Sequence, residues 1–197
     1  RTIPWLDRWA TSWQAARAGV CAAHRLEETL TDELRERAED CLAEHRGTFV
    51  ALLAQLAHAD ANTLNRATVA AADLAAVDAC TDPLALRERP LPSLERRAAV
   101  LAIREDLSRV SSMRGAGQFK EALALARTTA SAAEAAEWPA MTSEALYWVS
   151  TLESTLGEGS AAEGTAIRSL GEARAAHSAQ AAAAALVLLA EIDERGA

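Results

Sequence analysis

The chain has 197 residues, half of them apolar, and a formal net charge of -8 at pH 7. This length and apolar content predict a folded protein with a substantial core and argue against intrinsic disorder. The negative charge argues against nucleic-acid binding, because a phosphate backbone attracts basic surfaces. No apolar run reaches the roughly 18 to 20 residues that a bilayer-spanning helix needs, so we do not expect this chain to insert into a membrane.

The composition predicts an all-α fold. Aromatic residues make up only 4% of the chain, alanine is abundant, and the few glycines and prolines cluster at expected turns. A first helix should begin near Pro4, because Trp5, Trp9 and Trp13 recur every four residues and form one apolar stripe. Such a stripe is typical of a helix face packed in a core. An aromatic cage for a ligand is the alternative.

The next elements follow in chain order up to a proline-rich connector. Thr31 precedes a second helix that should run to about His58 and form an antiparallel hairpin with the first. A third helix should end near Cys80. The closely spaced prolines of residues 90–92 oppose helix and predict an extended connector. We therefore assign residues 1–89 to an N-terminal helical region of three helices.

Beyond the connector, glycines recur at intervals of about 40 residues, a period that predicts stacked helical hairpins. Gly117, Gly157 and Gly196 each close an apolar amphipathic segment. Gly117-Gln118-Phe119-Lys120-Glu121-Ala122 resembles the G-x-Y/F-x-x-A corner of a tetratricopeptide repeat, whereas Gly159 departs from it where Tyr or Phe is usual. The resemblance implies antiparallel helix pairs in a short right-handed α-solenoid. The expected repeats are residues 93–138, 139–177 and a truncated third, 178–197.

Repeats of this kind bind partners on the concave face formed by the first helix of each pair. The resemblance therefore implies a protein or peptide ligand, and an ordinary solvated helix surface is the alternative for each candidate residue. In this register the candidates are Arg104, Ser111, Arg114, Glu144, Tyr147, Thr151 and Ser154. The helix after residue 178 lacks a following partner, so its edge is a candidate surface for pairing with a second copy of the chain.

All three cysteines precede the connector. Cys21 and Cys41 would lie at equal heights on facing helices if the hairpin turned near residues 29–31, and we weigh a disulfide between them against two buried thiols. Cys80 would then be a free thiol or a competitor for one of the other two.

The sequence gives little sign of reaction chemistry. A zinc site combining His24 and His45 with Cys21 and Cys41 is not expected, because the histidines would differ in height by about 10 Å. Motifs for a nucleophile elbow, a phosphate-binding loop, a zinc protease and a protein kinase are absent. We predict no catalytic residue, no metal and no cofactor. The least favoured alternative is an all-helical enzyme with a site between Trp5, His24 and acidic residues of the second helix.

The order of landmarks resembles that of one family, the bacterial Ser/Thr protein kinases that carry tetratricopeptide repeats. The resemblance covers nearly the whole chain: Cys21, then Cys41-Leu42, His58-Ala59-Asp60-Ala61, Ala79-Cys80-Thr81-Asp82-Pro83-Leu84 and a proline-containing connector precede the repeats. It implies a non-catalytic interaction or sensor region of a larger, membrane-anchored kinase. This region would lie outside the cytoplasm, with a cytoplasmic location as the alternative. A repeat arm of a transcriptional regulator or signalling ATPase is the alternative function.

Overall fold

The computed structural model describes residues 2–89, 91–93 and 95–196. These residues form helices and no strands, which confirms the predicted all-α class. The chain divides into two compact units, residues 1–93 and 94–197, and each is described here by itself. The predicted proline connector lies beside this division.

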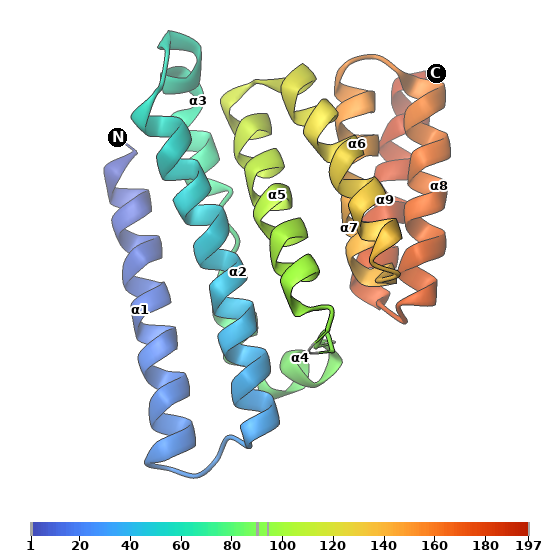
Figure 1. The fold of residues 1–197 in the computed structure, drawn as a ribbon. Helices are drawn as coiled ribbons and strands as arrows, with labels where there is room; N and C mark the ends of the chain where they lie inside the picture. The colour runs from blue at the N-terminus through green and yellow to red at the C-terminus, as the bar shows by residue number, and fades with distance from the viewer. Residues whose placement is uncertain (1, 90, 94, 197) are drawn as a thin grey trace. The chain divides into compact units, whose positions relative to one another are not determined.

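Unit 1 begins with an antiparallel hairpin of two long helices (Figure 1). Its elements are α1 (Ile3–Arg25), α2 (Asp32–Ala57), α3 (Ala61–Ala72), the 3-10 turn η1 (Asp78–Cys80) and α4 (Pro83–Glu88). Thr31, Asp60 and Asp82 cap α2, α3 and α4, since each side chain accepts a hydrogen bond from a first-turn backbone N–H. The third helix is shorter than predicted: α3 ends at Ala72, and η1 follows it as a separate element.

The tryptophan stripe of α1 packs in unit 1, as its spacing predicts. Trp9 stacks on Phe49 of α2 with ring centroids 4.6 Å apart, and its indole N–H donates to the Ala75 carbonyl at 2.9 Å. The Trp13 indole N–H donates to the Leu42 carbonyl of α2 at 2.8 Å. Trp5, nearer the start of the helix, is 40% exposed. The stripe therefore joins α1 to α2 through ring packing and one hydrogen bond, and to the segment between α3 and η1 through another.

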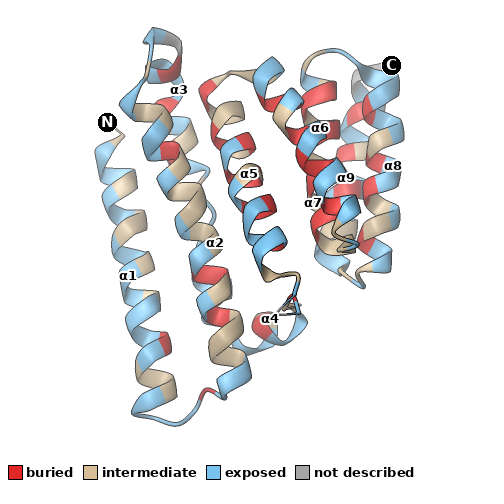
Figure 2. Ribbon diagram, viewed as in Figure 1, coloured by how far each residue is buried: buried red, intermediate tan, exposed pale blue. Residues whose placement is uncertain are grey.

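Unit 2 consists of five consecutive helices. They are α5 (Arg97–Ala116), α6 (Phe119–Ala135), α7 (Pro139–Thr155), α8 (Gly159–Ala175) and α9 (Ala179–Gly196). Each helix packs against the next, and the alternate helices also meet, α5 with α7 and α7 with α9. Helix α7 is central in these contacts, and buried residues follow most of its length (Figure 2).

Four connections in unit 2 share one backbone device at a regular spacing. Gly117, Glu137, Gly157 and His177 all have positive φ, with values of 85°, 50°, 83° and 53°. Each donates its backbone N–H to a carbonyl three residues earlier in the preceding helix. A left-handed residue at this place ends a helix and reverses the chain. The glycine period seen in the sequence is therefore a double period, with a non-glycine turn halfway.

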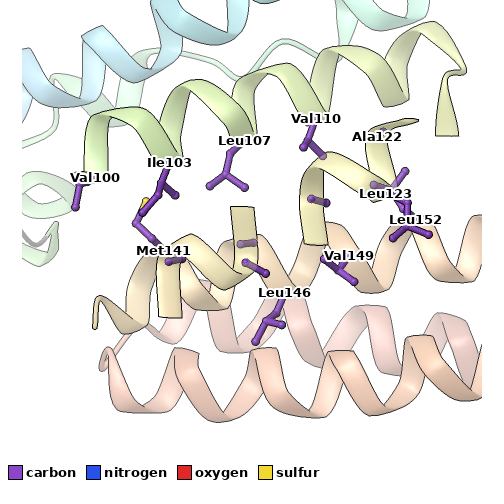
Figure 3. Packing of buried hydrophobic residues seen from close by; sticks show 14 residues of the cluster. Val100, Ile103, Leu107, Val110, Ala122, Leu123, Met141, Leu146, Val149 and Leu152 are labelled. Atoms are coloured by element: carbon purple, nitrogen blue, oxygen red, sulfur yellow. The ribbon is translucent and has the colours of Figure 1, made fainter. Parts of the chain in front are cut away.

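The main core of unit 2 lies between α5, α6 and α7 (Figure 3). Large side chains come mostly from α5 and α7, whereas α6 contributes small ones, because alanine lets helices approach closely. Buried members are Val100, Ile103, Leu107 and Val110 of α5, Ala122, Leu123, Ala126, Ala130 and Ala133 of α6, and Met141, Ala145, Leu146, Val149 and Leu152 of α7.

Candidate functional site

The predicted partner-binding residues fall on α5 and α7, two helices that contact each other. They occupy matching positions, since Arg104, Ser111 and Arg114 are each 40 residues before Glu144, Thr151 and Ser154. Tyr147 matches Leu107, which is buried in the core. We call the seven predicted residues the repeat face.

Six of these residues are half-buried, so each side chain retains some accessible surface. They are Ser111, Arg114, Glu144, Tyr147, Thr151 and Ser154. Arg104 differs from this pattern: it is only 7% exposed and offers little surface to a partner. The Thr151 hydroxyl donates to the Tyr147 carbonyl of its own helix at 2.8 Å. The hydroxyl oxygen of Thr151 can still accept a hydrogen bond from a ligand.

An aromatic and cationic group forms the centre of the repeat face. The Arg114 guanidinium of α5 lies 5.4 Å from the centroid of the Trp148 ring of α7. Trp148 meets Tyr147 edge to face, with centroids 5.7 Å apart and an interplanar angle of 75°. Tyr147 in turn packs against the cluster that Ala162 and Ala166 of α8 form with Leu188 and Ile192 of α9. These contacts lead from α5 through α7 to the cluster that α8 and α9 share.

Trp148 was not among the residues predicted for the repeat face. The structure shows it half-buried against the core while its ring also receives Arg114. The sequence does contain a signal for Trp148. It follows Tyr147 directly, and it stands four residues after Glu144, so it lies on the same side of the helix as that residue.

Helix α9 carries matching positions that were also missed. Val187, Glu191 and Glu194 stand 40 residues after Tyr147, Thr151 and Ser154, and all three are exposed. Continuing the 40-residue register beyond the second repeat would have found them. In the 40-residue register these positions carry an apolar residue and two carboxylates, which are opposite in sign to Arg114.

A buried carboxylate lies next to the face and fixes the neighbouring helices. The Glu153 side chain is 5% exposed; one oxygen accepts from Arg127 of α6 at 2.9 Å and the other from the Thr165 hydroxyl of α8 at 2.9 Å. The hydrogen bond to Glu153 raises the pKa of Arg127, and Glu158 adds to this. Glu153 thus ties α7 to α6 and α8, and its carboxylate is not available to a ligand.

Among the pairings that the sequence left open, the structure shows the one in which Cys80 takes the place of Cys21. Cys41 of α2 and Cys80 of η1 form a disulfide with Cα atoms 5.4 Å apart, while Cys21 is free and exposed. The possible Cys21–Cys41 bridge does not form, because Cys21 lies four residues from the end of α1 and Cys41 nine residues from the start of α2. The difference of five residues corresponds to about 7.5 Å along the helices. Cys21 also follows the inward-facing Val20 and points to another side of α1.

His45 lies beside this disulfide. Its ligand-capable nitrogen and the sulfurs of Cys41 and Cys80 all lie within 4.8 Å of one another. Burial lowers the pKa of His45, and Arg89 lowers it further, against opposing effects of Glu44 and a hydrogen bond to the Ala75 backbone. The imidazole is therefore held mainly neutral. We call Cys41, His45 and Cys80 the cysteine–histidine cluster.

No protein-family model, curated protein or solved structure matches the chain. Over the part of the chain that the structure describes, no helix combines the length and apolar character needed to cross a membrane.

Proposed function

We propose that this chain is a non-catalytic interaction region that binds a protein or peptide on the repeat face of unit 2. The observation that carries the proposal is the series of contacts from Arg114 through Trp148 and Tyr147 to the cluster that α8 and α9 share. Half-buried tyrosine, tryptophan and arginine side chains are the residue types that contribute most to protein binding.

The arrangement of the helices supports a tetratricopeptide-like solenoid as the scaffold. Three alternate helices contact one another in order, and turns recur every 20 residues from Gly117 to His177. In such arrays the alternate helices form the inner wall that receives an extended ligand. The Arg114 guanidinium of α5 and the Glu191 and Glu194 carboxylates of α9 would then orient a ligand that carries both charge signs.

We further propose that this region belongs to a larger bacterial Ser/Thr protein kinase and regulates it. The support is the resemblance in the order of cysteine, proline and repeat landmarks. The disulfide between Cys41 and Cys80 favours an extracytoplasmic location, because such bonds persist in oxidising compartments. The complete reading frame tests this: a kinase domain and a membrane span before Arg1 would support it. A nucleotide-binding or helix-turn-helix domain there would support a signalling ATPase or transcriptional regulator instead.

Peptide binding can be tested without a known partner. We would select peptides from a random display library on the intact chain and measure their affinity for purified variants. Tyr147→Ala and Arg114→Ala should each weaken binding at least about tenfold, since loss of a central anchor costs more than 1 kcal/mol. Ile167→Ala is the matched control, because Ile167 is 55% exposed on α8 and outside the repeat face.

Cross-linking supplies a second measurement. A photoreactive residue at Thr151 should capture the selected peptides, whereas the same residue at Ile167 should not. Peptides that bind all variants equally, and that cross-link only from Ile167, would contradict the proposal. Circular dichroism of every variant separates loss of binding from loss of fold.

A further inference from the structure

The cysteine–histidine cluster brings together two sulfurs and one imidazole from two elements. Cys41 and His45 are four residues apart and therefore lie on the same side of α2, while Cys80 comes from η1. Within the described residues, this is the one group of three or more such side chains close enough to share an ion. We propose that, once the Cys41–Cys80 disulfide is reduced, these three residues bind one Zn²⁺ ion.

The spacing suits a tetrahedral zinc ion after a small local change. Zinc bonds of about 2.3 Å to sulfur and about 2.0 to 2.1 Å to nitrogen place neighbouring ligand atoms about 3.6 to 3.8 Å apart. The three ligand atoms already lie within 4.8 Å of one another. Once the covalent bond is broken, the two sulfurs need only separate by side-chain rotation. Two thiolates and one imidazole form a donor set typical of zinc, and water supplies the fourth ligand.

His45 has the surroundings that metal-binding histidines usually have. It hydrogen-bonds the Ala75 backbone, the kind of contact that orients a metal-binding imidazole. Burial favours the neutral ring, the form that binds a metal. The nearby cation Arg89 is paired with Glu44 and lies 3.5 Å from an Asp40 oxygen, so its charge is compensated. His45 is half-buried while both sulfurs are buried, which leaves its side of the cluster as the route for an ion.

The chemistry balances with an external dithiol as the reductant. The dithiol transfers two electrons and two protons to the bridge: its own two sulfurs join, the Cys41–Cys80 bond breaks, and two thiols form. Zn²⁺ then binds both sulfurs and His45 and releases the two thiol protons. Zinc and the disulfide are therefore mutually exclusive, and either one joins α2 to η1.

The test uses the full chain in a Cys21→Ser background, so that the exposed third thiol cannot contribute. The protein is reduced with a phosphine, which unlike a dithiol competes weakly for zinc, and is titrated with Co²⁺ and then Zn²⁺. We expect thiolate-to-cobalt charge-transfer and d–d absorption at one ion per chain, displaced by Zn²⁺. The oxidised protein should show neither. Zinc should also slow alkylation of Cys41 and Cys80, as followed by mass spectrometry.

His45→Ala should weaken zinc binding at least about tenfold. The variant loses a direct zinc ligand, which matters more than a residue that only hydrogen-bonds a ligand. His58→Ala is the matched control, since His58 is an exposed residue at the end of α2 outside the cluster. Equal affinities for the two variants, or no one-to-one cobalt spectrum, would overturn the proposal. If reduction alone unfolds unit 1, zinc must restore the helical circular dichroism. A reduced chain that stays unfolded with zinc would overturn it as well.

Discussion

Ser143 and Ser169 hydrogen-bond each other's backbone across α7 and α8. The Ser143 hydroxyl donates to the Ser169 carbonyl at 3.0 Å, and the Ser169 hydroxyl donates to the Ser143 carbonyl at 2.8 Å. Both side chains are 1% exposed. A small hydroxyl at each position lets the two helices approach closely while every buried donor is satisfied.

Replacing either serine should destabilise the protein. We expect Ser143→Ala and Ser169→Ala each to lower the free energy of unfolding by about 1 kcal/mol, as for a typical buried hydrogen bond. The loss of unfolding free energy in the double variant should differ from the sum of the two single losses, because the two residues are in contact. Urea unfolding measures this. Ser131→Ala, an exposed serine on α6, is the control and should change little. Values equal to the control would contradict the prediction.

Replacing two glycines of unit 2 by alanine should change the stability of the protein in opposite directions. Gly157 has φ of 83° with open space around an added Cβ, so Gly157→Ala should destabilise by about 1 kcal/mol through backbone strain alone. Gly164 lies inside α8, also with open space, and Gly164→Ala should stabilise by about 1 kcal/mol. Thermal melts of both variants provide the test. A shift of the same sign for both would refute the assigned turn.

Because the Glu153 carboxylate is buried, replacing its partner Arg127 should destabilise the protein more than replacing Arg168, another surface arginine. Arg127→Met should cost about 1 to 3 kcal/mol, because it leaves a buried charged acceptor with fewer hydrogen bonds. Arg168→Met removes an ion pair with Glu134, in which both side chains are well exposed, and should cost about 0 to 1 kcal/mol. Chemical denaturation of the two variants compares them directly. Equal costs would show that Glu153 does not depend on Arg127.

The disulfide should contribute strongly to the stability of unit 1. Cys41 and Cys80 are 39 residues apart in sequence, and a closed loop of that length corresponds to about 4 kcal/mol in the chain-entropy account. Urea unfolding of oxidised and reduced protein, both with a metal chelator, measures the difference. Cys21→Ser should have almost no effect. Peptide mapping that finds Cys21 in the bridge would contradict the assigned pairing.

The periodic features could be predicted from the sequence because they depend on residue type. Gly117 and Gly157 mark turns since glycine tolerates positive φ. Glu137 and His177 adopt the same conformation although neither residue type signals it, and the expected repeat boundaries after residues 138 and 177 lie directly beside them. The alternation of helices then placed six of the seven repeat-face residues on accessible surface.

The sequence could not decide among the possible cysteine pairings, because the pairing depends on where helices end and not on periodicity. Cys21 and Cys41 are symmetric about residue 31, yet the loop between α1 and α2 spans residues 26–31. The early end of α3 at Ala72 and the short turn η1 bring Cys80 to α2 instead. Local sequence patterns indicate helix boundaries of this kind only within a few residues.

The Cys41–Cys80 bridge encloses α3 and the non-helical segment between Ala72 and Asp78. Hydrolysis of a peptide bond in that segment would not separate the fragments, because both remain attached through sulfur. A nicked molecule would run as intact material on a denaturing gel without thiol, heavier only by one water, and would split into two bands after reduction.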